Sequence, residues 1–504
     1  MEEKEGFPEI LFSDFFRVNK RYLKEYGAFN ISLVSDLPLF IDPFLIFNSK
    51  RDDYQNLHQS IVKYLTFIKE KSVNKNINRG SLLSWYRFKE VKQNWLGYSS
   101  EGNKGHALGN KFAQSLNNNF ILVFNDFDCR ENEVGVRGIH LEKLCLIGEG
   151  IGKDNISDFT TNLIKDYLLK YTESFARKYL DKGFCRIFRI PRAKFNFQTE
   201  TWEEGPYFLP NYKEDFVILT PEDMLAKDDI WINHADLINN FRFIPPSISN
   251  EQLRNEINNY FQKVLDVKVT KNGKKIITEK SEREAAKKTV ERFPIIIDYY
   301  IKYKEDNGER AVEVSKRRVE ESEYLYTNNF TDLISLLYKE TRFYKIATNS
   351  YIDALQRAEY LKNVIENNGG YRFFYNKNGA PIERESDLEI LYRLTYCNSR
   401  FDFNSQVNNG RGPVDAKTSM GASDATIAEL KLASNTHLEK NLKRQIPIYQ
   451  KASKASKSVI IILYFSEREQ KRVEEILKRL GLLNEESIIS IDARKDNKPS
   501  ASTA

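Results

Sequence analysis

The C-terminal part of the sequence places two carboxylates and a lysine where they could act together on one substrate. Glu429 and Lys431 stand two residues apart in an apolar stretch, so on a β-strand both side chains leave the same face. If residues 414–419 and 426–432 pair as a hairpin, Asp415 reaches that face as well. Carboxylate oxygens on adjacent strands are ligands that Mg²⁺ prefers. A neighbouring lysine can activate a water molecule or stabilise charge on a phosphate during its transfer.

The Glu-x-Lys spacing also has a simpler explanation, because a charged pair on an exposed strand face is ordinary solvated surface. The same spacing recurs at Glu90–Lys92 and at Glu469–Lys471, so it does not define a site by itself. The pair at Glu429 differs in its context, because an aspartate precedes it on the neighbouring strand and apolar residues frame it. The framing residues are Ile427, Ala428, Leu430 and Leu432. We therefore treat Asp415, Glu429 and Lys431 as candidate catalytic residues.

The surrounding sequence predicts alternating helices and strands that would hold these residues in place. Ser386 is the expected N-cap of the first helix, and Gly481 is the expected stop of the last one. One continuous apolar run is typical of a buried strand. The expected elements are a helix at 385–396, strands at 402–408, 414–419 and 426–432, a helix at 437–452, a strand at 458–465, a helix at 467–480 and a strand at 487–492.

This arrangement, with Pro413-Val414-Asp415 followed by Glu429-Leu430-Lys431, resembles the PD-(D/E)xK nuclease superfamily. Gln445 and Tyr449, four residues apart on one helix face, resemble the helix of its RecB-type branch. The resemblance implies a restriction-endonuclease-like αβββαβ core that hydrolyses DNA with Mg²⁺, or with Mn²⁺ as a substitute. It also implies that Asp415 and Glu429 ligate the metal ion. Lys431 would activate water or stabilise charge.

The resemblance assigns further residues outside the hairpin. Gln445 and Tyr449 would orient the substrate or groups of the active site. The first helix of this superfamily often adds an acidic residue, for which Glu385 and Glu389 are the two candidates, and spacing favours neither. Pro447 lies inside the helix of Gln445 and Tyr449, where a proline removes a backbone hydrogen bond and bends or starts the helix.

Positive charge gathers on and after the same helix, next to the candidate site. Near a phosphodiesterase centre this charge would neutralise backbone phosphates, and binding would weaken with salt. A solvated helix face explains the same residues equally well. The candidate nucleic-acid-binding residues are Lys440, Lys443, Arg444 and Lys451.

The composition of the 504 residues is typical of a folded intracellular protein. Hydrophobic residues make up 41% of the chain, enough for packed cores, and the net charge is a modest +6. The four cysteines show neither metal-ligand nor disulfide spacing, which suits a reducing cytoplasm. The N-terminus lacks the apolar core of a signal peptide, and no run reaches the ~18–20 apolar residues of a membrane span. We expect a soluble, cytoplasmic protein.

The predicted fold class is α/β multidomain. Residues 1–245 are expected to form an α/β domain with a recognition or regulatory role, and they resemble only uncharacterised bacterial proteins. Residues 246–370 are expected to form a helical linker domain, which could clamp nucleic acid, dimerise or act as a spacer. Residues 371–494 are the nuclease-like domain, and 495–504 are expected to be a disordered tail.

Local patterns in the N-terminal half predict structure rather than chemistry. Asp36 and Asp42 are expected to cap turns near proline, and functional carboxylates are the alternative. Ser157 is the expected cap of an amphipathic helix, and residues 201–210 are expected to be a loop between short strands. No phosphate-binding glycine motif is found in the sequence, so we expect no ATPase.

The expectation for the whole chain is a Mg²⁺-dependent deoxyribonuclease. A nuclease with a large accessory domain and no motor suggests bacterial restriction or anti-phage defence, by analogy. Two alternatives stay open: a non-catalytic nucleic-acid-binding or sensor protein on a nuclease scaffold, and an RNA-directed nuclease with the same site. The expected partner is DNA, or RNA in the second alternative, and no membrane. A homo-oligomer or a partner protein of a defence system is also open.

Overall fold

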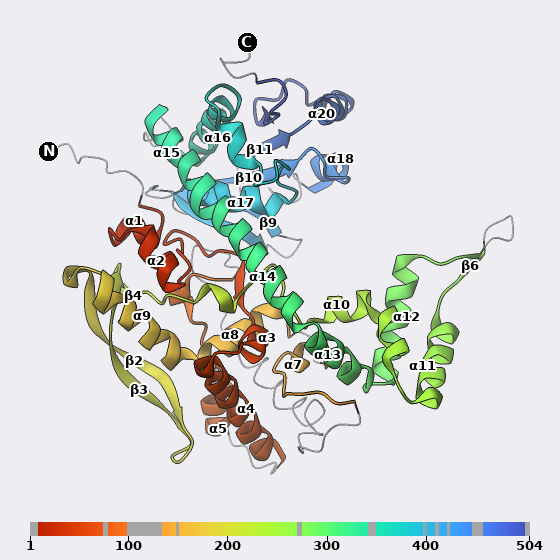
Figure 1. Ribbon diagram of the computed structural model, residues 1–504. Coiled ribbons are helices and arrows are strands. Elements are labelled where there is room, and N and C mark those ends of the chain that lie inside the picture. Colours follow the sequence, from red (N-terminus) through yellow and green to blue (C-terminus); the bar gives the residue numbers. More distant parts are fainter. Residues whose placement is uncertain are drawn as a thin grey trace.

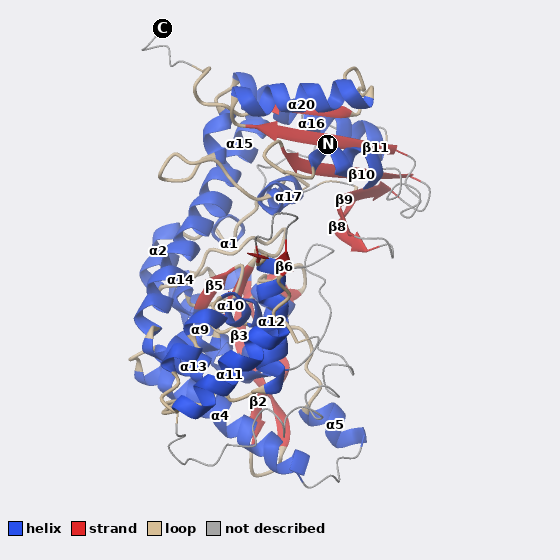
Figure 2. Cartoon of the chain, turned by 90° about the vertical axis from the view of Figure 1, so that its right-hand side faces the viewer, coloured by secondary structure: helices blue, strands red, loops and turns tan. Residues whose placement is uncertain are grey.

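The structure is a computed structural model of the chain. A five-stranded sheet with its helices forms the C-terminal body, and the N-terminal half forms a second body below it (Figures 1 and 2). A helical arm extends to the side in Figure 1. The chain is therefore a mixed α/β protein, as the sequence predicted. The structure describes residues 9–73, 79–97, 134–147, 151–269, 275–340, 349–396, 399, 401–408, 413–420, 424–445 and 457–498.

The C-terminal sheet is mixed, with strand order β12-β11-β10-β9-β8. β8, β9 and β10 are antiparallel neighbours, whereas β10, β11 and β12 run parallel. The hairpin predicted from the sequence is present as β9 and β10, the two strands that carry the candidate catalytic residues. The strands are β8 (Asp402–Asn408), β9 (Pro413–Met420), β10 (Asp424–Leu432), β11 (Lys457–Tyr464) and β12 (Ile488–Asp492).

Helices cover both faces of this sheet, which explains the continuous apolar sequence of β11. Val459 and Ile461 belong to the main core, whereas Ile460 and Ile462 pack with Val473 of α20 in a second cluster. Because successive strand residues point to opposite faces, a strand covered on both sides needs apolar residues throughout. The helices around the sheet are α16 (Ser350–Asn367), α17 (Glu385–Leu394), α18 (Leu438–Lys440) and α20 (Glu467–Leu480).

The ends of α20 agree with the sequence, whereas the start of α17 does not. The Ser466 side chain accepts the Glu469 N–H at the start of α20, and Gly481 ends it in a left-handed conformation with φ of 70°. α17 already begins at Glu385, because the Asp387 N–H donates to the Arg384 carbonyl at 3.2 Å and closes a turn that includes Ser386. The prediction of Ser386 as the N-cap was therefore wrong.

The described residues of the N-terminal half form helices and two small sheets. Strand β1 (Leu39–Ile41) pairs with β5 (Leu225–Lys227). A long antiparallel hairpin and a short third strand form the other sheet, from β2 (Cys185–Asn196), β3 (Thr201–Tyr212) and β4 (Asp215–Phe216). The helices are α1 (Phe12–Phe15), α2 (Lys20–Tyr26), α3 (Pro43–Asn48), α4 (Asp52–Val73), α5 (Arg79–Trp85), α7 (Lys143–Ile147), α8 (Lys153–Leu163) and α9 (Lys165–Tyr179).

Two predictions for the N-terminal half were wrong. Residues 201–210 are not a loop but most of β3, because they pair along their length with β2. Ser157 caps no helix, since α8 already begins at Lys153, and the Ser157 Oγ instead accepts the Ile41 N–H at 2.9 Å. The prediction for Asp42 is confirmed, because it caps α3 by accepting the N–H of Phe44 at 2.9 Å.

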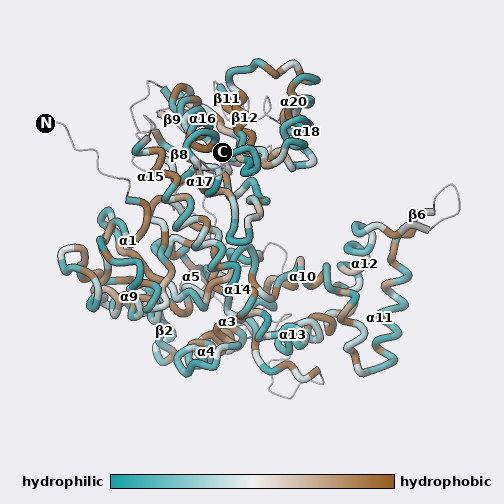
Figure 3. The backbone as a smooth tube through the Cα atoms, turned by 45° about the horizontal axis from the view of Figure 1, so that its top comes forward, coloured by the Kyte–Doolittle hydropathy of each residue, from teal (hydrophilic) through white to brown (hydrophobic). Residues whose placement is uncertain are grey.

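The middle of the chain is helical, as predicted. α11 and α12, joined through the short strands β6 (Lys268–Val269) and β7 (Lys275–Ile276), make up the arm that reaches away from the rest (Figure 3). The helices are α10 (His234–Asn239), α11 (Glu251–Val264), α12 (Glu279–Arg292), α13 (Ile296–Asp306), α14 (Gly308–Ser322) and α15 (Phe330–Glu340). Across the described ranges, no helix combines the length and the apolar character that a membrane crossing requires.

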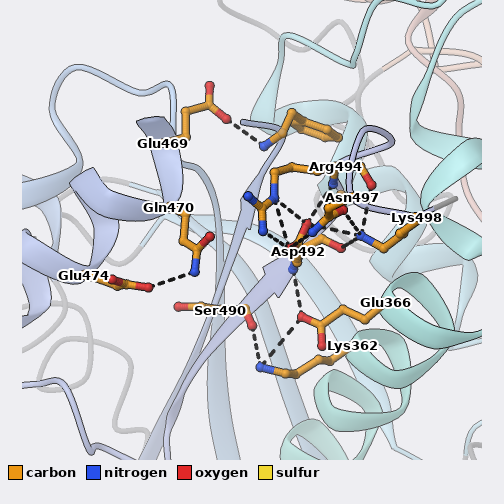
Figure 4. A network of polar contacts seen from close by, with 12 residues as sticks. Lys362, Glu366, Glu469, Gln470, Glu474, Ser490, Asp492, Arg494, Asn497 and Lys498 are labelled. Carbon is orange, nitrogen blue, oxygen red and sulfur yellow. Dashed lines mark hydrogen bonds and ion pairs between the residues drawn. The ribbon is translucent and has the colours of Figure 1, made fainter. Parts of the chain in front are cut away.

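The segment after the last strand is structured as far as residue 498. Asp492 at the end of β12 accepts hydrogen bonds from Arg494 Nε at 3.0 Å and from Lys498 Nζ at 3.2 Å (Figure 4). Lys495 Nζ donates to the Gly379 carbonyl at 2.8 Å. Through these contacts, residues 495–498 of the expected tail lie against the C-terminal body. Residues 499–504 lie outside the described ranges.

Candidate active site

The β9–β10 hairpin brings Asp415, Glu429 and Lys431 to one place. The ladder pairs Ala416 with Ala428, so the next residues, Asp415 and Glu429, come opposite each other on the same face of the sheet. The backbone N–H of Leu430 donates to Asp415 Oδ2 at 2.9 Å and holds this carboxylate against β10. The shared face expected from the spacing is therefore present.

The Lys431 ammonium lies between three carboxylates. Its Nζ is 2.7 Å from Asp415 Oδ2, 2.9 Å from Glu429 Oε2 and 3.7 Å from Glu385 Oε2. The side chains of Lys431 and Glu429 are only 7% and 4% exposed, whereas those of Asp415 and Glu385 are 16% and 24% exposed. The cluster is thus buried at Glu429 and reaches solvent at the other two carboxylates.

Glu385 connects the start of α17 to the end of β10. Its Oε1 accepts the Leu432 N–H at 3.1 Å and the Asn435 side-chain amide at 2.8 Å. Of the two glutamates that the sequence left open, Glu385 is the one whose carboxylate reaches Lys431, and Glu389 follows one turn later on α17. Asn435 was not among the residues predicted for the site. Its position just after the strand that carries Glu429 and Lys431 is the feature of the sequence that could have identified it.

Burial and neighbouring charges set the protonation states in the cluster. Loss of water around Glu429, followed by the charge of Asp415, raises the pKa of Glu429 to about 8, although Lys431 acts in the opposite direction. Burial lowers the pKa of Lys431, but the three carboxylates outweigh burial, and the pKa lies above its ordinary value. At neutral pH, Lys431 is charged and Glu429 holds a proton in this arrangement.

The helix expected at 437–452 is described only in its first part. α18 continues into a π-helical turn, Asn441–Gln445. Lys440 and Lys443 are exposed on this segment. Their exposure is compatible both with a nucleic-acid-binding face and with a solvated helix face. The side chains of Arg444 and Gln445, and the whole of Pro447, Tyr449 and Lys451, lie outside the described residues, so their predicted roles stay predictions.

The chemistry of the carboxylates suits a hard divalent cation. Glu429 Oε1 is buried and has no hydrogen-bond partner within the described residues, which costs about 1–3 kcal/mol and which a cation would relieve. Carboxylate oxygens of this kind are preferred by Mg²⁺. Among the described residues, no group of three or more His, Cys, Asp or Glu side chains is arranged to hold a metal ion. In the candidate site, the Lys431 ammonium occupies the space between the carboxylates. Metal binding therefore competes with the contacts of Lys431.

Comparison with known proteins gives two family matches. Residues 17–233 match a family described as Domain of unknown function (DUF8370), and residues 350–467 match another described as Domain of unknown function (DUF8371). No curated protein and no solved structure matches the chain. The second match begins at α16 and includes Glu385, α17 and the β9–β10 hairpin. The function therefore has to be argued from the geometry of the site.

Proposed function

We propose that the chain is a Mg²⁺-dependent nuclease that hydrolyses DNA phosphodiester bonds at the cluster of Asp415, Glu429 and Lys431. The observation that carries the proposal is a buried ammonium 2.7 Å from one carboxylate and 2.9 Å from another on paired strands. Burying these charges costs several kcal/mol per ion, and packed apolar residues of similar volume often stabilise a protein equally well. A purely structural hairpin has no need of such a cluster.

The topology supports placing the C-terminal domain in the PD-(D/E)xK superfamily, with a restriction-endonuclease-like core. α17 precedes the antiparallel strands β8, β9 and β10, and a helical segment leads on to the parallel strand β11. Asp415 lies on the second of these strands, and Glu429 and Lys431 lie on the third. The order of the elements, the strand directions and the positions of these residues are the observations that support this placement.

Each residue of the cluster has a role that follows from its surroundings. Asp415 and Glu429 are the residues that would hold Mg²⁺, with Glu385 as a third carboxylate. When bound, the ion supplies Lewis acidity to the phosphate and lowers the pKa of a coordinated water. Lys431 stays protonated, so it stabilises negative charge on the phosphate rather than taking a proton from water.

Cleavage assays test this proposal directly. Supercoiled plasmid, linear duplex, single-stranded DNA and RNA are incubated with the protein in Mg²⁺, in Mn²⁺ and in EDTA. We expect metal-dependent cleavage of DNA that falls at least about 100-fold in Lys431→Ala and in Asp415→Ala, while circular dichroism shows that both variants fold. RNA cleavage alone would favour the RNA-directed alternative.

The matched control is Lys471→Ala, which removes the lysine of another Glu-x-Lys. Lys471 lies on α20, its side chain is 67% exposed, and it pairs with Glu467 at 2.6 Å. We expect this variant to cleave like the wild type. Full activity in both Lys431→Ala and Asp415→Ala would refute the assignment of the site.

A second candidate function is a non-catalytic nucleic-acid-binding or sensor protein that keeps the nuclease core as a scaffold. The observation that favours it is the ammonium of Lys431, which already offsets the carboxylates without a metal. A calorimetric titration with Mn²⁺ separates the two functions. The nuclease binds Mn²⁺ and loses that binding in Asp415→Asn, whereas the scaffold binds none.

The biological setting that we propose is restriction or anti-phage defence in the bacterial cytoplasm. It is an analogy from a nuclease-like domain joined to a large accessory part, since fold alone does not define a role. Plaque counts on cells that carry the chain or its Lys431→Ala variant test this setting, and protection by the former alone is the expected result.

A further inference from the structure

Two cavities adjoin where the N-terminal half, α14 and the C-terminal domain meet. The first has a volume of about 130 Å³ and includes Trp231 in its lining. The second has a volume of about 230 Å³ and extends to Tyr324 and to Arg384, next to α17. Lys227 of β5 and Arg318 of α14 line both cavities and stand at their boundary. Together the cavities reach the lower end of the range of small-molecule sites, about 300–1,000 Å³.

The buried and half-buried carboxylates around these cavities already have hydrogen-bond donors. A carboxylate that accepts a hydrogen bond is already stabilised and does not require an additional cation. Such a carboxylate also offsets the charge of a neighbouring cation only in part. The pairs are Asp42 with the Trp231 N–H (2.7 Å), Asp229 with the Ile230 N–H (3.1 Å), Asp236 with Lys304 (2.8 Å), Asp228 with Arg384, and Asp387 with the Tyr326 hydroxyl (2.8 Å).

Lys227 and Arg318, in contrast, make no direct contact with a carboxylate among the described residues. Both are half-buried, and neither forms an ion pair with any residue in the described part of the chain. Lys227 Nζ lies 5.3 Å from the centre of the Tyr326 ring. Burial raises the pKa of Asp387, and the charge of Lys227 acts against this rise without an ion pair. Burial also raises the pKa of Asp229, and the charge of Arg318 acts against that rise, again without an ion pair. A cation that has lost part of its hydration without gaining a counter-ion is destabilising. An anion between the two side chains would remove this cost.

We propose that this junction binds a small phosphate-bearing ligand, with its phosphate group between Lys227 and Arg318. A guanidinium presents a rigid fork of donors that matches two phosphate oxygens, and a lysine adds a compact point charge. The two side chains come from different elements, β5 and α14, so a phosphate between them bridges the N-terminal half and the central helix. The cavities on both sides of the pair hold the rest of the ligand.

The ligand also acts on the helix that supplies Glu385, a consequence that rests on the proposed function. Arg384 lines the second cavity, pairs with Asp228 of the N-terminal half, and directly precedes the first residue of α17. The part of the ligand that occupies the second cavity meets Arg384 there. If it draws Arg384 away from Asp228, it changes the start of α17 and with it the position of the Glu385 carboxylate. Binding itself is measured without any cleavage, so the junction site and the nuclease can fail separately.

Isothermal titration calorimetry on the full chain at low ionic strength tests the proposal. The probes are inorganic phosphate, pyrophosphate and adenosine monophosphate, which separate a bare phosphate from a phosphate on a larger ligand. We expect saturable binding of at least one probe. The binding should weaken at least tenfold in Arg318→Gln and in Lys227→Gln, since each removes one charged contact.

The matched control is Arg317→Gln, because Arg317 is the exposed neighbour of Arg318 on the same helix. This variant should bind like the wild type. The proposal is overturned if no probe gives saturable binding, or if Arg317→Gln weakens binding as much as Arg318→Gln does. It is also overturned if Arg318→Gln and Lys227→Gln, both folded by circular dichroism, keep full affinity.

Discussion

Charge balance around Lys431 governs the candidate site at the scale of single residues. One ammonium offsets Asp415, Glu429 and Glu385, and Glu429 lowers the remaining negative charge by holding a proton, with a pKa of about 8. A carboxylate has to be ionised before it can ligate a metal ion, so metal binding releases this proton. The affinity for Mn²⁺ should therefore rise with pH until Glu429 is ionised in the free protein.

The pKa of Glu429 also predicts how stability depends on pH. Because the folded pKa is raised above the unfolded one, the stability that Glu429 contributes is complete below about pH 4.5 and is lost as pH rises through about 8. Glu429→Gln carries a side chain that stays neutral. We expect it to match the wild type near pH 5 and to exceed its stability at pH 9 by on the order of a few kcal/mol.

Urea unfolding of both proteins between pH 5 and pH 9 measures this difference. The comparison isolates Glu429, because the other groups titrate in both proteins. Parallel stability curves would mean that Glu429 is ionised throughout, and the charge balance described for the cluster would then be wrong.

Contact between α17 and β10 completes the site at the scale of secondary-structure elements. Glu385 Oε1 joins them through the Leu432 N–H and the Asn435 amide, while its Oε2 faces Lys431. Loss of a side chain that orients the residues of a metal site typically changes activity or metal affinity by about 10–100-fold. The first helix therefore contributes both a carboxylate and the alignment of the strand.

Glu385→Gln tests this contribution. The variant can keep one acceptor for Leu432, but it places an amide instead of a carboxylate near the ammonium. We expect a fall of about 10–100-fold in metal-dependent cleavage, with the melting temperature little changed. Glu383→Gln, an exposed change two residues earlier, serves as the control. Equal cleavage rates for these two variants would remove Glu385 from the site.

Whether a feature could be predicted from the sequence depends on how far apart in the chain the interacting residues lie. The shared face of Asp415, Glu429 and Lys431 depends on the two-residue period of strands, so it was predictable. The choice between Glu385 and Glu389 was not, because both stand on one side of a helix and only the contact with β10 separates them. Residues 201–210 contain prolines and a glycine that suggest a loop, yet pairing with β2 makes them a strand.

A continuous core joins the two halves at the scale of the whole molecule. One hydrophobic cluster includes residues from Ile10 in the N-terminal half to Ala493 after the last strand. α17 takes part in the contact with polar residues as well, because buried Arg393 donates to the Ser35 hydroxyl at 2.8 Å. Burial raises the pKa of neighbouring Asp36 well above its ordinary value, and the charge of Arg393 acts against this rise. The helix of the candidate site is thus held from both halves.

This continuity predicts that the two halves unfold together. Arg393→Gln removes a buried hydrogen bond from a charged group, worth about 1.5–3 kcal/mol, and leaves Asp36 without the cation that favours its ionised form. Differential scanning calorimetry should show one transition that shifts as a whole, and the exposed change Arg468→Gln should leave it in place. Two transitions, of which Arg393→Gln moves only one, would mean that the halves are independent and that α17 does not couple them.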